Sequence, residues 1–129
     1  MNVKSLPTAY PEIYEALYSL GITATYIGFF HTSYAVYLAV QQPERLLLVT
    51  KWIYPDVAKQ YQTDWRNVER NIRTVANIVW KCCPDTLSSI AHFDLERRPS
   101  NSQFIAILTF HVLRLTKDAL AQTISPISA

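Results

Sequence analysis

Side chains that could recognise nucleic acid are concentrated between residues 64 and 81. Four of them can address the edges of DNA bases: Asn67, Glu69, Arg70 and Arg73. Arginine can donate two hydrogen bonds to O6 and N7 of guanine, asparagine can bind adenine in the same bidentate manner, and glutamate can accept from the amino group of cytosine. The segment therefore has the residue types needed to read a base sequence, provided that they share one accessible face.

A helix would place them on such a face. At 100° per residue, Val68, Ile72, Val75 and Val79 form one apolar stripe. The opposite stripe holds cationic and polar residues, namely Arg66, Arg70, Arg73, Asn77 and Lys81. We expect a helix over 64–81, anchored in a core along its apolar flank. The pattern alone leaves open that its polar flank is simply solvated.

The residues before this helix favour a helix-turn-helix unit. A second short amphipathic segment covers 53–61, and only Gln62 and Thr63 separate it from the longer helix. Ala58 and Val68 are spaced so that two helices could cross closely between them. Gln62 stands where a glycine is usual. In such units the second helix enters the major groove with its N-terminal residues. We expect Thr63 to cap this helix, Asp64 to lie in its first turn, and Trp65 to belong to the core.

Contacts with DNA phosphates need cations or exposed amides nearby. Between Lys51 and Lys81 there are six cations and three anions, a local surplus of +3 in a chain of net charge +2. Phosphate contacts fix the register of a protein on DNA without reading its sequence. Arg98 either touches phosphate or is solvated. The candidate phosphate-binding residues are Lys51, Lys59, Thr63, Arg66, Lys81, Arg98, Ser100 and Asn101.

The rest of the chain predicts an all-α fold, a compact single domain over 1–129 of about six helices. Only two glycines occur, which disfavours a turn-rich β fold. Gly21 should end the first helix, and Ser100 with Gln103 forms a capping box before the last helix. Residues 1–8 and 122–129 are expected to fray. The other helical segments are expected at 10–20, 31–40, 50–61, 84–91 and 104–120, with Pro43 opening a short apolar segment at 46–49 and an irregular stretch at 92–99.

Several functions are disfavoured by the composition. No secretory signal and no membrane-spanning apolar run are visible, and adjacent Cys82 and Cys83 are expected to be free thiols in a cytoplasmic protein. The three histidines, His31, His92 and His111, lack ligand partners at helical spacing. We therefore expect no metal, no cofactor and no enzymatic activity.

Four stretches together resemble the C-terminal effector domain of the stage 0 sporulation protein A family, the bacterial response regulators that initiate sporulation. The resemblance covers about residues 17–115. The stretches are Leu20-Gly21-Ile22 with Ile27-Gly28-Phe29, the run from Val49 to Ala58, Val68-Glu69-Arg70-Asn71-Ile72-Arg73, and the run from Arg98 to Ala106.

This resemblance implies a six-helix DNA-binding fold that recognises an element resembling TGTCGAA, often in tandem copies. It also implies contacts between copies on tandem sites and a contact with RNA polymerase. Glu69 and Arg70 occupy base-reading positions of the family, whereas Asn67 stands where the family has arginine. We expect an altered base preference there, because asparagine favours adenine. Family proteins carry a receiver domain before this region, and the sequence leaves open whether one precedes this chain.

A second class of function remains open. Asn67 and the low net charge of +2 also fit a degenerate helix-turn-helix module that docks another protein and no longer binds DNA.

Overall fold

The computed structural model describes residues 10–124, with side chains described as far as residue 118. Helices and their connections make up this range, without a strand, so the predicted all-α class is confirmed. The elements are α1 (Tyr10–Ser19), α2 (Ile27–Gln41), the 3-10 helix η2 (Pro43–Leu48), α3 (Val49–Trp52), α4 (Tyr54–Gln60), α5 (Trp65–Cys82), α6 (Pro84–Ala91) and α7 (Asn101–Ile124).

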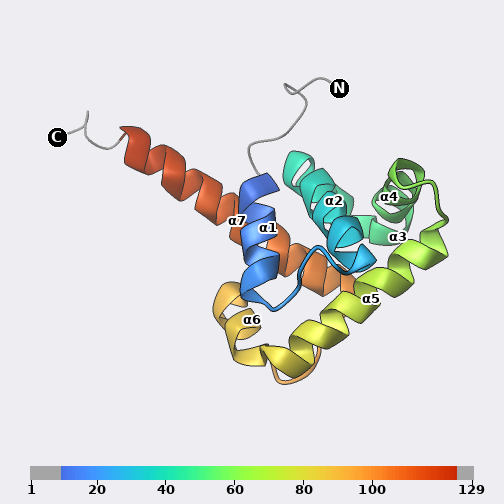
Figure 1. Cartoon of the computed structure of the whole chain (residues 1–129). Helices are drawn as coiled ribbons and strands as arrows, with labels where there is room; N and C mark the ends of the chain where they lie inside the picture. The colour runs from blue at the N-terminus through green and yellow to red at the C-terminus, as the bar shows by residue number, and fades with distance from the viewer. Residues whose placement is uncertain (1–9, 125–129) are drawn as a thin grey trace.

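Helix α2 is the centre of the arrangement and packs against α1, α4, α5 and α7. Helix α5 runs along one side of the molecule, with α4 at its start and α6 at its end (Figure 1). The long α7 contacts α1, α2, α5 and α6. The core between these helices is fully buried and includes Leu17, Phe29, Ile72 and Phe104. One flank of α5 is thus fixed by the core.

Gly28 sets the distance between α2 and α5. A Cβ at Gly28 would lie 2.5 Å from Val75 Cγ2 and 2.6 Å from the Asn71 backbone oxygen, so only a residue without a side chain fits. We predicted a connector up to Gly28 and a helix from His31. That boundary was wrong, since α2 already begins at Ile27. The first turn of α2 thus lies directly against α5.

The segment predicted as one helix over 50–61 is divided in two. α3 ends at Trp52 and α4 begins at Tyr54, with Ile53 between them at φ −119° and ψ −56°. Pro55 explains the interruption, because proline has no backbone N–H to bond the preceding turn and is tolerated only in the first turn of a helix. Because of this division, the structure has more helices than the sequence predicted.

The turn between α4 and α5 is a Schellman motif. The Thr63 N–H donates to the Ala58 carbonyl at 2.9 Å and the Gln62 N–H donates to the Lys59 carbonyl at 3.4 Å. Gln62 has φ 55°, the left-handed conformation that such a cap needs. The same motif ends α1, where Gly21 has φ 84° as the sequence predicted. At the turn between α4 and α5, glutamine takes the place that glycine fills at Gly21.

We predict that Gln62→Gly stabilises the domain. A left-handed non-glycine residue costs about 1–2 kcal/mol, and the greater freedom of glycine in the unfolded chain cancels about 0.5–1 kcal/mol of that. The free energy of unfolding should therefore rise by about 0.5–1 kcal/mol. Urea denaturation followed by circular dichroism measures it, with Gln60→Gly inside α4 as the control, which should lose stability. Equal losses in both variants would contradict the strain at Gln62.

Helix α6 and the capping box before α7 confirm two predictions, whereas the predicted end of α7 is corrected. Helix α6 matches the predicted range 84–91. In the capping box before α7, the Ser100 N–H donates to Gln103 Oε1 at 2.9 Å and the Gln103 N–H donates to Ser100 Oγ at 3.2 Å. Helix α7 reaches Ile124 and so includes residues 122–124, which we expected to fray. The other segments expected to fray, 1–8 and 125–129, lie outside the described residues.

The two adjacent cysteines lie at the end of α5. Cys82 and Cys83 are joined by a disulfide, so the expectation of free thiols was wrong. Cys83 leaves the helical conformation after α5, with φ −143° and ψ 50°, and this brings the two sulfurs together. Among the described residues, no helix combines the length and the apolar character needed to cross a bilayer.

His31 links α2 to α5 from inside the core. The residue is 1% exposed, its Nδ1 lies 3.3 Å from Asn71 Nδ2, and its Nε2 has no hydrogen-bond partner among the described protein atoms. Burial lowers the pKa of His31, because the charged imidazolium is poorly solvated there.

Stability should therefore fall in mild acid. The unfolded chain binds a proton on His31 near pH 6.5, before the folded chain does, so stability is full above about pH 6.5 and declines as the pH drops toward the lowered folded pKa. His31→Gln should flatten this decline in urea titrations between pH 7 and 5. His111→Gln is the comparison, since burial and Arg114 also lower the pKa of His111. An unchanged pH slope in His31→Gln would count against a buried neutral imidazole.

Candidate nucleic-acid interface

Helix α5 has the two faces that its sequence predicts. Val68, Ile72, Val75 and Val79 are at most 1% exposed, which confirms the apolar stripe. On the outer side, Arg66, Arg70, Arg73 and Lys81 are all exposed. Glu69 is the one acidic residue within the helix, so α5 itself is strongly cationic. A cationic, polar helix face held by a core on its other side is suited to a polyanion.

The start of α5 differs by one residue from the prediction. Asp64, not Thr63, is the N-cap: it has an extended backbone (φ −108°, ψ 164°) and its Oδ1 accepts the Asn67 N–H at 2.9 Å. A carboxylate at this place also interacts favourably with the positive end of the helix dipole. Thr63 lies in the turn and accepts a hydrogen bond of 2.9 Å from Asn67 Nδ2.

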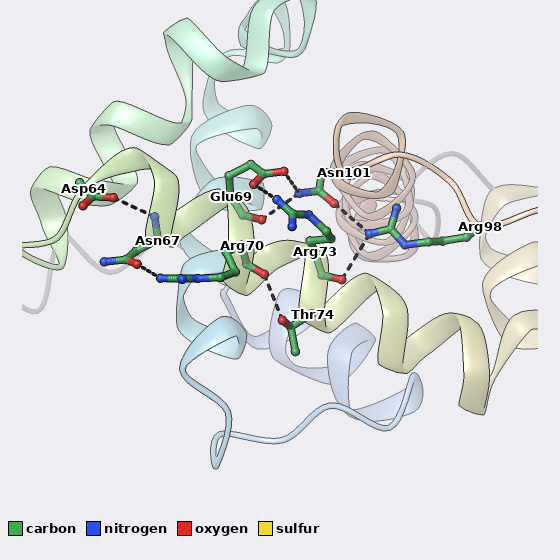
Figure 2. Close-up of polar contacts among 8 residues, drawn as sticks. All are labelled: Asp64, Asn67, Glu69, Arg70, Arg73, Thr74, Arg98 and Asn101. Carbon is green, nitrogen blue, oxygen red and sulfur yellow. Dashed lines mark hydrogen bonds and ion pairs between the residues drawn. The ribbon is translucent and has the colours of Figure 1, made fainter.

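Asn67 connects the turn to Arg70. Its side chain donates to Thr63 Oγ1. It also accepts a hydrogen bond from Arg70 Nη2, which Figure 2 shows. Arg70 is exposed, and its backbone carbonyl accepts from Thr74 Oγ1 at 3.1 Å. One edge of the Arg70 guanidinium is thus held by its own helix while the side chain faces outward. The Arg70 side chain is therefore partly ordered before any ligand binds.

Glu69 and Arg73 form an ion pair one turn apart on α5. The side chain of Glu69 is 30% exposed and that of Arg73 is 50% exposed. Asn101, the first residue of α7, donates from Nδ2 to the Glu69 backbone oxygen at 3.0 Å and lies 3.5 Å from Glu69 Oε2. Glu69 is therefore partly covered at the junction with α7, whereas Arg70 is exposed.

Arg98 occupies the same junction. Its guanidinium donates to the side chain of Asn77, to the Pro99 carbonyl at 2.7 Å, to the Arg73 carbonyl at 3.3 Å and to Asn101 Oδ1 at 3.1 Å. These bonds tie the segment before α7 to the outer face of α5 (Figure 2). Most of the hydrogen-bonding capacity of this candidate phosphate contact is thus used within the chain.

Two adjoining surface depressions gather most of the candidate residues. One is lined by the start of α5: Asp64, Trp65, Arg66, Asn67, Glu69, Arg70 and Arg73. The other shares Glu69 and Arg73 with it and adds Thr50, Tyr54, Arg98, Ser100, Asn101 and Ser102. The four proposed base-reading residues are therefore contiguous, and four of the proposed phosphate contacts border them.

Three lysines among the candidates lie outside these depressions. Lys51 lines a different one, beside Trp52, Arg45 and Asp56, the last two joined by an ion pair of 2.7 Å. Lys59 is exposed on α4. Lys81 is in the last turn of α5, about 20 Å along the axis from Asn67. These three lysines therefore lie apart from the residues that line the two depressions.

The prediction that Trp65 belongs to the core was wrong. This tryptophan is the first residue of α5 and is 41% exposed. The Arg66 guanidinium carbon lies 5.2 Å from the centre of the indole ring, a cation–π arrangement. This pair places an aromatic face and a cation beside the reading residues.

The sequence also left several lining residues unnoticed. Thr50 and Ser102 contribute exposed hydroxyl groups, and Tyr54 contributes a buried ring. Burial raises the pKa of the Tyr54 hydroxyl, and its hydrogen bond with Asn101 acts in the opposite direction. Thr50 stands next to the predicted Lys51 and Ser102 lies within the capping box, so both could have been noticed as neighbours of residues already singled out.

Comparison with known families gives a match over most of the chain. The model of the family described as the sporulation initiation factor Spo0A C terminal matches residues 13–112, which is more than half of the chain. The matched range runs from α1 into α7 and contains both depressions.

Proposed function

Because the chain belongs to the family of the Spo0A C-terminal domain, we propose that it reads duplex DNA in the major groove with the N-terminal half of α5. Members of this family are DNA-binding transcription effector domains of sporulation regulators and are not enzymes. The residues of this chain that touch DNA, and the groove that they enter, are our proposal.

The observation that carries it is the position of Arg70. This residue is exposed in the second turn of α5 and is braced by Asn67, while the opposite flank of the helix is buried. The major groove of B-DNA is wide enough to admit one helix. An exposed arginine near the N-terminus of a helix that follows a tight turn is the arrangement that helix-turn-helix proteins use to reach base edges.

We assign base reading to Asn67, Glu69, Arg70 and Arg73. Arg70 would donate to O6 and N7 of a guanine, and Glu69 would accept from a cytosine amino group. Asn67 would favour adenine where relatives with arginine favour guanine, so the preferred element should differ from TGTCGAA at that base. Arg73 forms an ion pair with Glu69 and would contact a base edge next to it.

The phosphate contacts would surround this patch. Arg66, Thr63 and Ser100 lie beside the reading residues, and Lys51, Lys59 and Lys81 would reach the backbone farther out. Arg98 and Asn101 were candidates for the same role, but their side chains bond to α5, and we assign them a different role below.

From the family resemblance we propose two partners in addition to DNA. Copies of the domain would touch each other on tandem sites, and one surface would contact RNA polymerase. A regulator that acts on promoter DNA would work in the bacterial cytoplasm.

Fluorescence anisotropy with a labelled duplex tests the proposal. The domain should bind a duplex that contains TGTCGAA, or this element with one base changed, more tightly than a scrambled duplex of equal length. The logarithm of the binding constant should fall with the logarithm of the salt concentration by about 0.9 for each phosphate contact. Absence of binding even at low salt would reject DNA reading and favour a protein-docking module.

A further inference from the structure

Arg98 is bound on several sides by oxygens of its own chain. Three of its nitrogens together donate to one side chain of α5, one backbone carbonyl of α5 and two acceptors next to α7. A guanidinium carries five N–H donors in a fixed planar fork. Four of the possible bonds are thus made inside the protein, and Arg98 is half-buried. The group is poorly placed to serve as a free phosphate contact.

The acceptors of Arg98 are the same residues that hold the reading face. Asn101 receives one Arg98 bond on Oδ1 and uses its Nδ2 to bond the backbone of Glu69. The Arg73 carbonyl receives another Arg98 bond, and Arg73 in turn pairs with the Glu69 carboxylate. A closed set of contacts therefore runs from Arg98 to both members of the Glu69–Arg73 pair (Figure 2).

We propose that Arg98 is a positioning residue for base discrimination. Resting on the function proposed above, this inference holds that Arg98 sets the orientation of Glu69 and Arg73 from outside the reading helix and touches no DNA itself. Asn101 transmits part of this effect. The base preference of α5 then depends on a residue in the segment between α6 and α7.

The physical reason is preorganisation. Glu69 and Arg73 have long side chains with many rotamers, and ordering such a side chain on binding costs free energy. Hydrogen bonds that fix the backbone and the carboxylate beforehand remove part of this cost for the matching base only. Non-specific binding, which depends on phosphate neutralisation, gains nothing from them.

The test compares Arg98→Ala and Arg98→Lys with Arg97→Ala in the anisotropy assay. Arg97 is adjacent, carries the same charge and is exposed, and none of the bonds described above involves it. For Arg98→Ala we expect the ratio between matched and scrambled duplex affinities to fall about tenfold, the effect of about one lost base contact. Affinity for the scrambled duplex and the salt slope should stay as in the unchanged protein.

Arg98→Lys separates positioning from phosphate contact. Lysine keeps the charge as a point cation but lacks the planar fork that serves several acceptors at once, so it should not restore discrimination. If instead Arg98 touches phosphate, Arg98→Ala should weaken all duplexes alike and lower the salt slope by about 0.9, and lysine should restore most of the loss. That result would overturn the inference, as would an Arg98→Ala variant that behaves like Arg97→Ala.

Asn77→Ala provides a second test, which does not require that Arg98→Ala folds. Asn77 is exposed and accepts from Arg98 Nε, so its removal loosens Arg98 without changing any residue proposed to touch DNA. We expect the same loss of discrimination on a smaller scale, with unchanged circular dichroism. If Arg98→Ala does not fold, full discrimination in both Asn77→Ala and Arg98→Lys overturns the inference. A protein that binds no duplex at all instead rejects the proposed function itself, and the inference with it.

Discussion

Arg70→Ala should lose about 1–3 kcal/mol of binding free energy to the preferred element, or roughly 5- to 150-fold in affinity. The reason is that alanine cannot donate to guanine O6 and N7, whereas the buried flank of α5 does not involve Arg70. Preference should relax at one base pair only, which a set of duplexes with single base changes would show by anisotropy competition.

The matched control is Lys59→Ala, which removes an exposed cation from α4. It should weaken all duplexes to a similar degree and lower the salt slope, the behaviour of a phosphate contact. If Arg70→Ala behaved like Lys59→Ala, with a uniform loss and unchanged base preference, Arg70 would be a phosphate contact and our assignment of base reading would be wrong.

Gly28→Ala should destabilise the domain, although alanine is the better helix former by about 1 kcal/mol. The added Cβ would meet Val75 Cγ2 at 2.5 Å and the Asn71 backbone oxygen at 2.6 Å, and the second of these cannot rotate away. Overpacking of this kind costs about 1–3 kcal/mol, which should exceed the gain in propensity. Helices α2 and α5 would have to move apart, so specific DNA binding should weaken together with stability.

Urea denaturation measures this effect, with Gly28→Ala/Val75→Ala as the comparison. The double variant removes the contact at 2.5 Å but keeps the one with the backbone oxygen, so it should not regain full stability. A Gly28→Ala protein more stable than the original, as expected for an ordinary glycine inside a helix, would contradict the close approach of α2 and α5.

The features of the reading helix that the sequence predicted correctly are those with a local cause. Val68 and Ile72 share a face because the α-helix repeats every 3.6 residues, and burial of both follows from that period. Ser100 and Gln103 form their capping box through bonds within four residues. Such features need no knowledge of which segments meet in space.

The features that the sequence missed depend on neighbours far along the chain. Trp65 falls on the apolar side of α5 by its period, yet it is 41% exposed at the first position of the helix. Gly28 reads as part of a connector until α5 is placed against it. Arg98 bonds to Arg73, 25 residues away, and no local pattern announces that contact.

The choice between Thr63 and Asp64 as the cap was a different kind of error. Both residues are good N-caps, and they are adjacent, so propensity could not separate them. The Schellman turn decides the matter, because it uses the Thr63 N–H to close α4 and leaves Asp64 as the first residue in the extended conformation.

The central claim, that Arg70 on α5 donates to a guanine in the major groove, is tested most directly by a double-mutant cycle. The original protein and Arg70→Ala are each titrated with the preferred duplex and with duplexes in which one guanine at a time is replaced by 7-deazaguanine, which lacks the N7 acceptor. At one guanine we expect the replacement to weaken the original protein but to have little further effect on Arg70→Ala, with a coupling of about 0.5–3 kcal/mol. Additive losses at every guanine would contradict the claim.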